Sequence, residues 1–338
     1  MEQRIAQFSQ WIVNCLNQPL QEIKQIPGDA STRRYFRVFI EQKSYILMDA
    51  PNQVDSLTDF LLVNQHLQAQ QVNVPEVLAS NLDDGFLLLS DFGDQTLLKI
   101  LTIDNADFIY RQAIDSLLKV QLDTAKNAQT LNHFDCNMMQ REIELFTGWF
   151  LTRQLKLKLT NSESQRLQQD IDCLIQTVNQ QPYVYCHRDY HSRNLLLLVN
   201  QQIGIIDFQD AVNGPISYDL VSLLRDCYIR WPSKQVQNWV KYYHQHAQRH
   251  DLIDCSVEQF LYWFDWTGIQ RHIKAIGIFA RLDLHFNKHQ FLNDIAIPLD
   301  YLIDISSNYP KLQTFHHWVK NRIKPKFAEY LATHQDRA

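Results

Sequence analysis

The fold of this chain is decided by the stretch His187-Arg188-Asp189-Tyr190-His191-Ser192-Arg193-Asn194. It contains an H-R-D triplet followed by an asparagine at the spacing found in phosphoryl-transfer catalytic loops. The apolar run Leu195-Leu196-Leu197-Leu198-Val199 comes directly after it and predicts a buried strand. A second acidic segment, Ile205-Ile206-Asp207-Phe208-Gln209-Asp210, follows shortly afterwards. This order of loop, strand, turn, strand and aspartate predicts a site that holds a base close to metal ligands.

The residue types in this stretch suit the chemistry of phosphoryl transfer. We expect Asp189 to accept or orient the proton of an attacking hydroxyl. Asn194 and Asp207 carry the oxygen donors that Mg²⁺ prefers, and Mg²⁺ neutralises the phosphates of ATP. An isolated H-R-D triplet is equally compatible with a capped turn, and Asp-Phe is a common pair. The order of the motifs and the position of the asparagine favour the catalytic interpretation.

Composition limits the classes of partner. The chain has 338 residues, enough for two domains, and 32 Lys and Arg against 37 Asp and Glu give a net charge of −5. This balance argues against a nucleic acid or an anionic membrane as partner. The six cysteines form no C-x-x-C pair and no signal peptide is recognisable, so we expect reduced thiols in a cytoplasmic protein. No apolar run reaches the roughly 18 residues of a membrane helix.

The predicted elements change type along the chain. Strands are expected early, near 22–26, 35–40, 45–48, 76–80 and 86–90, with a helix at 55–69 between them. Helices dominate later, near 104–122, 137–157, 162–179, 218–230, 233–248, 256–277, 290–307 and 310–333. Segregated strands and helices predict an α+β fold with a small, mostly antiparallel β lobe and a larger helical lobe. We expect the lobes to span residues 1–92 and 93–338, with a hinge near 90–94.

A nucleotide needs a loop that faces its phosphates, and the chain has no glycine-rich phosphate loop among its eight glycines. The loop at 27–33 joins two predicted strands, and its amides and hydroxyls suit phosphate oxygens. The candidate phosphate-binding residues there are Gly28, Ser31, Thr32 and Arg33. At the hinge, Ser90 and Asp91 are candidates beside adenine, which would bind through backbone groups. An ordinary polar turn is the alternative interpretation of each loop.

The chain resembles the aminoglycoside phosphotransferase/choline kinase family of the protein-kinase-like fold over almost its whole length. Within that family it is similar to the bacterial kinases that phosphorylate N-acetylmuramate and N-acetylglucosamine at the anomeric hydroxyl during cell-wall recycling. The segments that carry the resemblance are Gly28–Val38, Met48-Asp49-Ala50-Pro51, Cys186–Leu195, Ile206–Ala211, Ser222–Asp226 and Gln270–Arg281.

The resemblance implies an ATP-dependent kinase that uses Mg²⁺ and acts on a small amino sugar. It implies that Asp189 is catalytic, that Asn194 and Asp207 bind Mg²⁺, and that the loop at 28–33 faces phosphate. It further implies that Asp219 braces the backbone of the catalytic loop.

The chain departs from the wider kinase pattern at its third strand. That strand usually ends with a lysine that holds the ATP phosphates, but Met48 occupies the corresponding place here. The helix at 55–69 contains no glutamate that would pair with such a lysine. One of Arg33, Arg34 and Arg37 is a candidate for the missing charge, because a guanidinium suits phosphate well. Since residues 34 and 37 of a strand point to opposite faces, not all three can serve.

Candidates for binding the substrate come from the helical part of the chain. They are Glu142, Arg225, Asp226 and Arg271. Arg225 and Asp226 follow an apolar run, where a charge must be paired or used. The alternative for each residue is a charge on a helix surface or a pair within a helix. An arginine would suit the lactyl carboxylate of N-acetylmuramate, but the sequence leaves open which one.

Other functions remain open at this point. A kinase of the same fold for an aminoglycoside, choline or homoserine is the nearest alternative, although the basic cluster at 270–274 argues against a cationic substrate. A pseudokinase that serves as an interaction module is suggested by the missing lysine, and the presence of Asp189, Asn194 and Asp207 argues against it. We expect a monomer.

Overall fold

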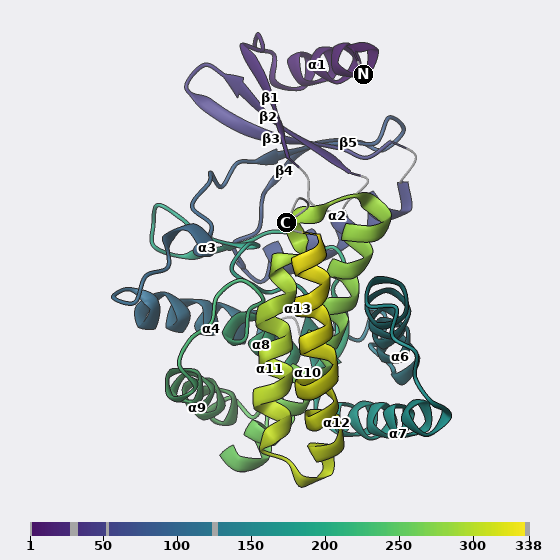
Figure 1. Cartoon of the computed structure of the whole chain (residues 1–338). Coiled ribbons are helices and arrows are strands. Elements are labelled where there is room, and N and C mark those ends of the chain that lie inside the picture. The colour runs from purple at the N-terminus through teal and green to yellow at the C-terminus, as the bar shows by residue number, and fades with distance from the viewer. Residues whose placement is uncertain (1, 28–32, 52–53, 124–127, 335–338) are drawn as a thin grey trace. The chain divides into compact units, whose positions relative to one another are not determined.

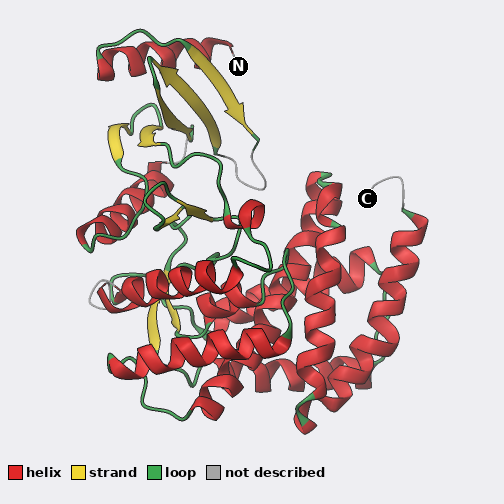
Figure 2. Cartoon of the chain, turned by 90° about the vertical axis from the view of Figure 1, so that its left-hand side faces the viewer, coloured by secondary structure: helices red, strands yellow, loops and turns green. Residues whose placement is uncertain are grey.

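The computed structural model describes residues 2–27, 33–51, 54–123 and 128–334. The chain divides into two compact units (Figure 1). The β unit comprises Met1–Ile100 and Arg193–Asp210, and the helical unit comprises Leu101–Ser192 and Ala211–Ala338. The first contains an antiparallel sheet and the second consists mostly of helices (Figure 2), which confirms the expected α+β class. Among the described residues, no helix combines the length and apolar character needed to cross a membrane.

The β unit is built on a five-stranded antiparallel sheet with the order β1-β2-β3-β5-β4. Its strands are β1 Glu22–Ile26, β2 Arg34–Ile40, β3 Lys43–Asp49, β4 Val77–Asn81 and β5 Phe86–Ser90. Helix α1 (Glu2–Leu16) buries Phe8 and Ile12 against a sheet face that includes Phe36 and Val38. Alternating side chains of a strand point to opposite faces, so this pattern follows from the period of two in β2. Helix α2 (Val54–Ala69) completes this part of the unit with Phe60 packed on Phe208.

A second hairpin joins the β unit from far along the chain. Strands β7 (Leu195–Leu197) and β8 (Ile203–Ile205) pair with each other in antiparallel register. The amide of Ile205 donates to the carbonyl of Asn73 at 2.8 Å, and the amide of Leu197 donates to Gln95 at 3.0 Å. Because of these hydrogen bonds, residues 193–210 belong to the β unit, so the two compact units do not correspond to a single division of the chain at residue 92. Helix α3 (Leu97–Ile100) also lies in the β unit.

The predicted strand at 195–199 is shorter in the structure. It ends at Leu197, and Val199 is fully exposed on the turn that follows. The division of the chain into functional lobes at 92 and 93 stays a prediction.

The helical unit contains one short two-stranded ribbon and many helices. The ribbon consists of β6 (Tyr183–Cys186) and β9 (Val212–Pro215), of which β9 was not predicted. The helices are α4 Ala106–Asp123, α6 Cys136–Leu145, α7 Asn161–Val178, α8 Tyr218–Leu224, α9 Ser233–Arg249, α10 Val257–Phe286, α11 Ala296–Ser307, α12 Gln313–Trp318 and α13 Lys324–Thr333. Short 3₁₀ turns lie at His289–Phe291, Asn293–Ile295 and Pro310–Leu312, and π-helical segments at Phe146–Gln154 and Val319–Ile323.

Several predicted helix bounds were wrong in this unit. The segment predicted as one helix over 137–157 changes from α to π geometry at Phe146. The segment at 218–230 ends at Leu224, and the segment predicted over 256–277 continues to Phe286. The segments predicted as helices at 290–307 and 310–333 are not continuous α-helices. Each contains short 3₁₀ or π-helical pieces as well as α-helix.

Helix α10 is the 30-residue centre of the helical unit. It is buried on nearly all sides, as expected for a helix that other helices surround. At Gly277 the junction of α6 and the π-helix approaches so closely that a Cβ atom there would lie 2.5 Å from the carbonyl carbon of Leu145 and also meet the amide of Phe146. This approach places α6 against the part of α10 that carries Gln270 and Lys274.

We expect Gly277→Ala to lower the free energy of unfolding by about 1–3 kcal/mol, because backbone atoms cannot rotate away from the added methyl group. Denaturant unfolding of the wild type and the variant measures this change. Gly148→Ala is the matched control, since a Cβ atom there has no neighbour within 4 Å. It should raise the stability by about 0.5–1 kcal/mol, as Gly→Ala does inside a helix. Equal effects of the two substitutions would contradict the close approach at Gly277.

Candidate active site

The catalytic loop begins at the end of β6, and Asp219 at the start of α8 fixes its first residues. The buried carboxylate of Asp219 accepts the amide of His187 at 2.6 Å and that of Arg188 at 2.9 Å. Arg188 has a φ of 75°, a left-handed backbone that a non-glycine residue adopts only where its surroundings hold it. The prediction that Asp219 braces the loop backbone is therefore confirmed.

The far end of the loop is held by Asp226. Its carboxylate accepts the amide of Ser192 at 2.9 Å and that of Tyr228 at 3.1 Å. Between the two ends, the amide of Asp189 donates to Nδ1 of His187 at 3.2 Å. Asp226 was predicted to bind substrate; the structure shows it supporting the loop, and a direct contact with substrate stays a prediction.

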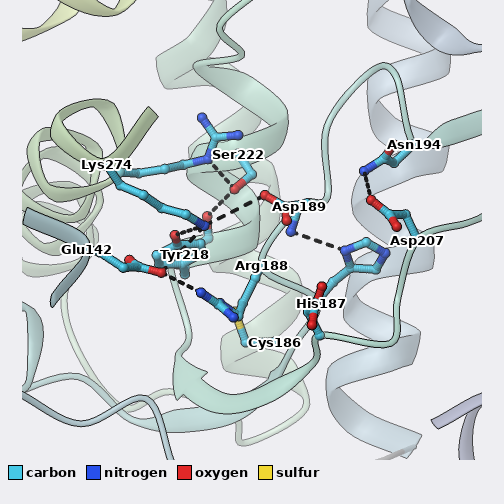
Figure 3. Close-up of polar contacts among 12 residues, drawn as sticks. Glu142, Cys186, His187, Arg188, Asp189, Asn194, Asp207, Tyr218, Ser222 and Lys274 are labelled. Carbon is cyan, nitrogen blue, oxygen red and sulfur yellow. Dashed lines mark hydrogen bonds and ion pairs between the residues drawn. The ribbon is translucent and has the colours of Figure 1, made fainter. Parts of the chain in front are cut away.

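Lys274 of α10 lies beside Asp189 (Figure 3). Its Nζ is 3.8 Å from Oδ1 of Asp189 and 3.6 Å from Oε1 of Glu142, and it donates to the hydroxyl of Tyr218 at 3.2 Å. Lys274 is buried, whereas the side chain of Asp189 keeps 40% of its surface exposed. The carboxylate is thus held by a buried cation and still accessible to a substrate hydroxyl.

Glu142 compensates the positive charges behind the loop. Its Oε1 accepts Nη2 of Arg188 at 2.5 Å (Figure 3). Its Oε2 accepts Nε2 of Gln270 at 2.9 Å. Buried charges are stable only when paired and hydrogen-bonded, and both oxygens of this carboxylate are used in that way. Glu142 was predicted to bind substrate, and here it supports the catalytic loop; a contact with substrate stays a prediction.

The surrounding charges keep Asp189 ionised. Burial by itself would raise the pKa of this carboxyl, but the positive charges of Lys274, His191, Arg188 and Arg271 outweigh burial and hold the pKa below its usual range. For Lys274 the effect is the converse: burial would lower its pKa, but Asp189 and Glu142 raise it above the ordinary value. Both groups of this pair are therefore charged at neutral pH.

The two predicted arginines have different surroundings. Nη2 of Arg225 pairs with Oδ1 of Asp265 at 2.5 Å, and Tyr309 donates to the other oxygen of Asp265 at 2.6 Å. The charge of Arg225 is thus compensated within the helical unit. Arg271 is buried on α10, where Nε donates to Oγ of Ser222 at 2.6 Å and Nη1 to Sγ of Cys227 at 3.4 Å. These partners are neutral.

The predicted metal ligands lie together in the β unit. Nδ2 of Asn194 is 3.4 Å from Oδ2 of Asp207 (Figure 3). Nε2 of Gln209 donates to Oδ1 of Asp207 at 2.9 Å. The amide of Ile206 donates to the carbonyl of Asn194 at 3.0 Å, which fixes the two segments side by side. Asp207 has a left-handed φ of 64°. An amide and a carboxylate oxygen fit Mg²⁺, which takes its remaining ligands from water and phosphate.

Only part of the predicted phosphate loop can be placed. Gly28, Ser31 and Thr32 lie outside the described residues. Arg33 is buried, contacts Oγ of Ser56 and hydrogen-bonds the hydroxyl of Tyr35. Burial raises the pKa of Tyr35, and the negative charge of Asp207 adds to this effect, so Arg33 and Tyr35 belong to the surroundings of the predicted metal ligands.

Of the other candidates for the missing lysine charge, Arg34 pairs with Asp49 at 2.5 Å, and Arg37 pairs with Asp91 at 2.6 Å and Asp94 at 2.7 Å. Both are bound to carboxylates inside the β unit. Met48 is fully buried in β3.

The predicted hinge residues form a turn. Oγ of Ser90 accepts the amide of Glu76 at 2.9 Å. Oδ1 of Asp91 accepts the amide of Gly93 at 2.8 Å, and Gly93 has a φ of 80°, which glycine adopts without strain. The side chains thus shape the loop, and a role beside adenine stays a prediction for both.

The structure supports each half of the predicted site by itself. Asp189 belongs to the helical unit, and Asn194 and Asp207 belong to the β unit, so their convergence stays a prediction. The sequence interpretation did not single out Lys274 as a partner of Asp189. A lysine inside the apolar surface of a helix was the available signal, because such a charge needs a partner.

Comparison with known proteins agrees with this geometry. Residues 22–253 match the model of the phosphotransferase enzyme family. A Pseudomonas putida protein named N-acetylmuramate/N-acetylglucosamine kinase is 36% identical over 91% of this chain and 94% of its own length. A Neisseria meningitidis protein of the same name is 37% identical over 92% of this chain and 93% of its own.

The same comparison extends to solved structures. Spectinomycin phosphotransferase, in complex with ADP and spectinomycin, superposes with a TM-score of 0.59 over 86% of this chain and 93% of its own, at 15% identity. At that identity the likeness concerns the fold, and the predicted protein-kinase-like fold is confirmed.

We expect Lys274→Met to raise the pKa of Asp189, because the substitution removes the positive charge that contributes most to lowering it. The carboxylate then loses stabilisation relative to the neutral acid. A ¹³C NMR titration of labelled aspartate carboxyls, with Asp189→Asn used to assign the signal, measures the shift. Lys274→Arg keeps the charge and is the control, which should leave the pKa low. An unchanged pKa in the Lys274→Met variant would show that other cations determine it.

Proposed function

The chain belongs to the phosphotransferase enzyme family, and we propose that it transfers the γ-phosphoryl group of ATP to the anomeric hydroxyl of N-acetylmuramate and of N-acetylglucosamine. The products are the sugar 1-phosphates, which serve the recycling of peptidoglycan. Support for the substrates comes from relatives that carry the name of these two sugars and align with nearly the whole chain. We propose that the enzyme acts as a monomer in the cytoplasm, where ATP is supplied and buried thiols such as Cys186 and Cys227 stay reduced.

The observation that carries the proposal is the accessible, ionised carboxylate of Asp189 on a rigid loop. Asp189 accepts a hydrogen bond from the sugar hydroxyl and orients its oxygen toward the γ-phosphorus. A bond forms between that oxygen and phosphorus, the bond to the oxygen bridging the β- and γ-phosphates breaks, and ADP leaves. The hydroxyl proton passes to Asp189. Asp219 and Asp226 contribute by fixing the loop that carries this base.

The low pKa of Asp189 agrees with an anomeric hydroxyl as the acceptor. A carboxylate whose pKa is held down by Lys274 is a weak base. The anomeric hydroxyl is more acidic than an ordinary alcohol, so it needs less help from the base. Phosphoryl transfer in addition passes through a loose transition state in which positioning matters more than proton removal. Orientation by a fixed carboxylate is therefore sufficient.

For the nucleotide, we propose that residues near 90–94 act as a hinge at which adenine meets the backbone, and that the loop at 27–33 faces the phosphates. We assign the missing lysine charge to Arg33, because it belongs to the loop at 27–33 and lies near Tyr35 and Asp207. Asn194 and Asp207 would hold Mg²⁺, which when bound neutralises the charge of the phosphates.

The charges near Asp189 also separate this function from its alternatives. Arg188, Arg271 and Lys274 place positive charge near the catalytic carboxylate that Glu142 compensates only in part, and this charge disfavours a cationic aminoglycoside or choline. A neutral or anionic sugar meets no such repulsion. The presence of a fixed Asp189 together with paired oxygen donors at Asn194 and Asp207 disfavours a pseudokinase.

We expect Asp189→Asn to lower kcat with N-acetylmuramate about 100- to 10,000-fold, because the amide cannot accept the hydroxyl proton. Asp254→Asn, which changes an exposed carboxylate, is the control and should keep full activity. Turnover that survives the Asp189 substitution would refute the assignment of the base.

The position of phosphorylation is tested on the product itself. ³¹P NMR of the product from N-acetylmuramate should show a phosphate on the anomeric carbon, coupled to the anomeric proton. A 6-phosphate, or ATP consumption with no sugar phosphate, would refute the proposed reaction and leave the family assignment untouched.

We expect Asp207→Asn to raise the Mg²⁺ concentration required for half-maximal activity by about tenfold or more, because a neutral amide replaces a charged ligand. Asparagine tolerates the left-handed backbone found at this position, so the fold should be retained. Titration of activity with Mg²⁺ at saturating ATP measures the change. An unaltered Mg²⁺ dependence would exclude Asp207 as a ligand.

A further inference from the structure

Arg271 is a buried cation in the helical unit that forms no direct ion pair with a carboxylate of the described residues, although the charges of Asp189 and Asp226 act on it at longer range. It keeps only 4% of its surface exposed, and its two named hydrogen bonds go to Ser222 and Cys227. Within the part of the chain that the structure describes, no Asp or Glu oxygen lies within 4 Å of its guanidinium. A guanidinium removed from water is costly unless an anion accompanies it. An anionic group of a ligand would supply the directly bonded partner that Arg271 lacks.

Three other arginines of the helical unit that lie near the loop or α10 have the direct carboxylate partner that Arg271 lacks. Arg188 is paired with Glu142, Arg225 with Asp265, and Arg230 with Asp300 and Asp304. Each pair compensates the positive charge inside the protein. Of the two arginines that lower the pKa of Asp189, Arg188 has such a partner and Arg271 has a hydroxyl and a thiol instead.

Arg271 lies close to the loop that carries Asp189, where a substrate would react. Arg271 and Lys274 lie three residues apart on α10 and so share one face of the helix. Lys274 reaches Asp189, and Arg271 reaches Ser222 on α8 and Cys227. Cys227 follows Asp226, the residue that holds the end of the catalytic loop. Arg271 is thus placed next to the loop that carries the base.

The guanidinium has a nitrogen to offer. Nε donates to Ser222 and Nη1 to Cys227. Nη2 donates to no residue that the structure describes, and it is not among the buried nitrogen atoms that lack a hydrogen-bond partner. The bonds to Ser222 and Cys227 fix the plane of the group. A fixed guanidinium is well suited to a carboxylate, which it recognises by charge and by planar geometry.

We propose that Arg271 recognises the lactyl carboxylate of N-acetylmuramate and thereby sets the preference between the two sugars; this inference rests on the proposed function. N-acetylmuramate carries a carboxylate on its lactyl ether, and N-acetylglucosamine has a hydroxyl at the same ring position. A single ring carbon separates that position from the anomeric carbon. A sugar whose anomeric hydroxyl meets Asp189 therefore extends its carboxylate over the adjoining surface, where Arg271 lies on the same face of α10 as Lys274.

The test compares the two sugars in one variant. Arg271→Gln should raise KM for N-acetylmuramate about 10- to 100-fold, the usual effect of losing a hydrogen bond to a charged group. Any effect on Asp189 of removing this charge should be common to both sugars, so the ratio of kcat/KM for N-acetylmuramate to kcat/KM for N-acetylglucosamine should fall about 10- to 100-fold. Arg271→Lys keeps the charge and should recover part of the affinity for N-acetylmuramate. Arg230→Gln, which removes an arginine already paired with Asp300 and Asp304, should alter neither sugar.

A second measurement needs no variant. The methyl ester of N-acetylmuramate removes the negative charge and should have a KM about 10- to 100-fold higher than the acid with the wild-type enzyme. With Arg271→Gln the acid and the ester should be equivalent. An equal loss of both sugars in Arg271→Gln, or an ester as good as the acid in the wild type, overturns the inference. Failure of the proposed function is different, because then neither sugar is phosphorylated by the wild type.

Discussion

The ion pair between Glu142 and Arg188, with Lys274 beside it, is largely removed from water. Charges removed from water must compensate one another, because the free energy of hydration that each loses on burial is larger than the free energy that packing contacts provide. The arrangement is therefore specified closely: Glu142 uses one oxygen for Arg188 and the other for Gln270. As a consequence, Asp189 remains ionised beside the buried ammonium group of Lys274.

Helix α10 makes this arrangement possible. It is long enough to contact several other helices, and its buried surface carries Gln270, Arg271 and Lys274 among apolar residues. The close approach at Gly277 brings α6 and its Glu142 against the same stretch. Around the helix the apolar side chains form one continuous core that includes Phe146, Ile273 and Leu302. The polar residues Gln270, Arg271 and Lys274 are thus surrounded by a well-packed apolar core, and such packing holds side chains in single positions.

Much of the fold followed from local patterns. Short strand-like runs separated by turn residues predicted the strands of the β unit. The helical unit was harder. The helix expected to end at 277 continues to Phe286, and Gly277 inside it serves the packing of α6. Strand β9 contains glycine and proline and has no pattern of its own, so only its partner β6 defines it.

The sequence by itself predicted which residue is the base and which residues suit the metal, and the family resemblance implied that Asp219 supports the loop. These assignments depend on residue type and on spacing within or next to one loop, which the linear order preserves. Only the tertiary structure decided which buried charges are already compensated. Arg225 meets Asp265 and Gln270 meets Glu142 across long stretches of chain, and Arg271 meets only neutral partners. Pairing between distant segments depends on how helices pack, and no local pattern records it.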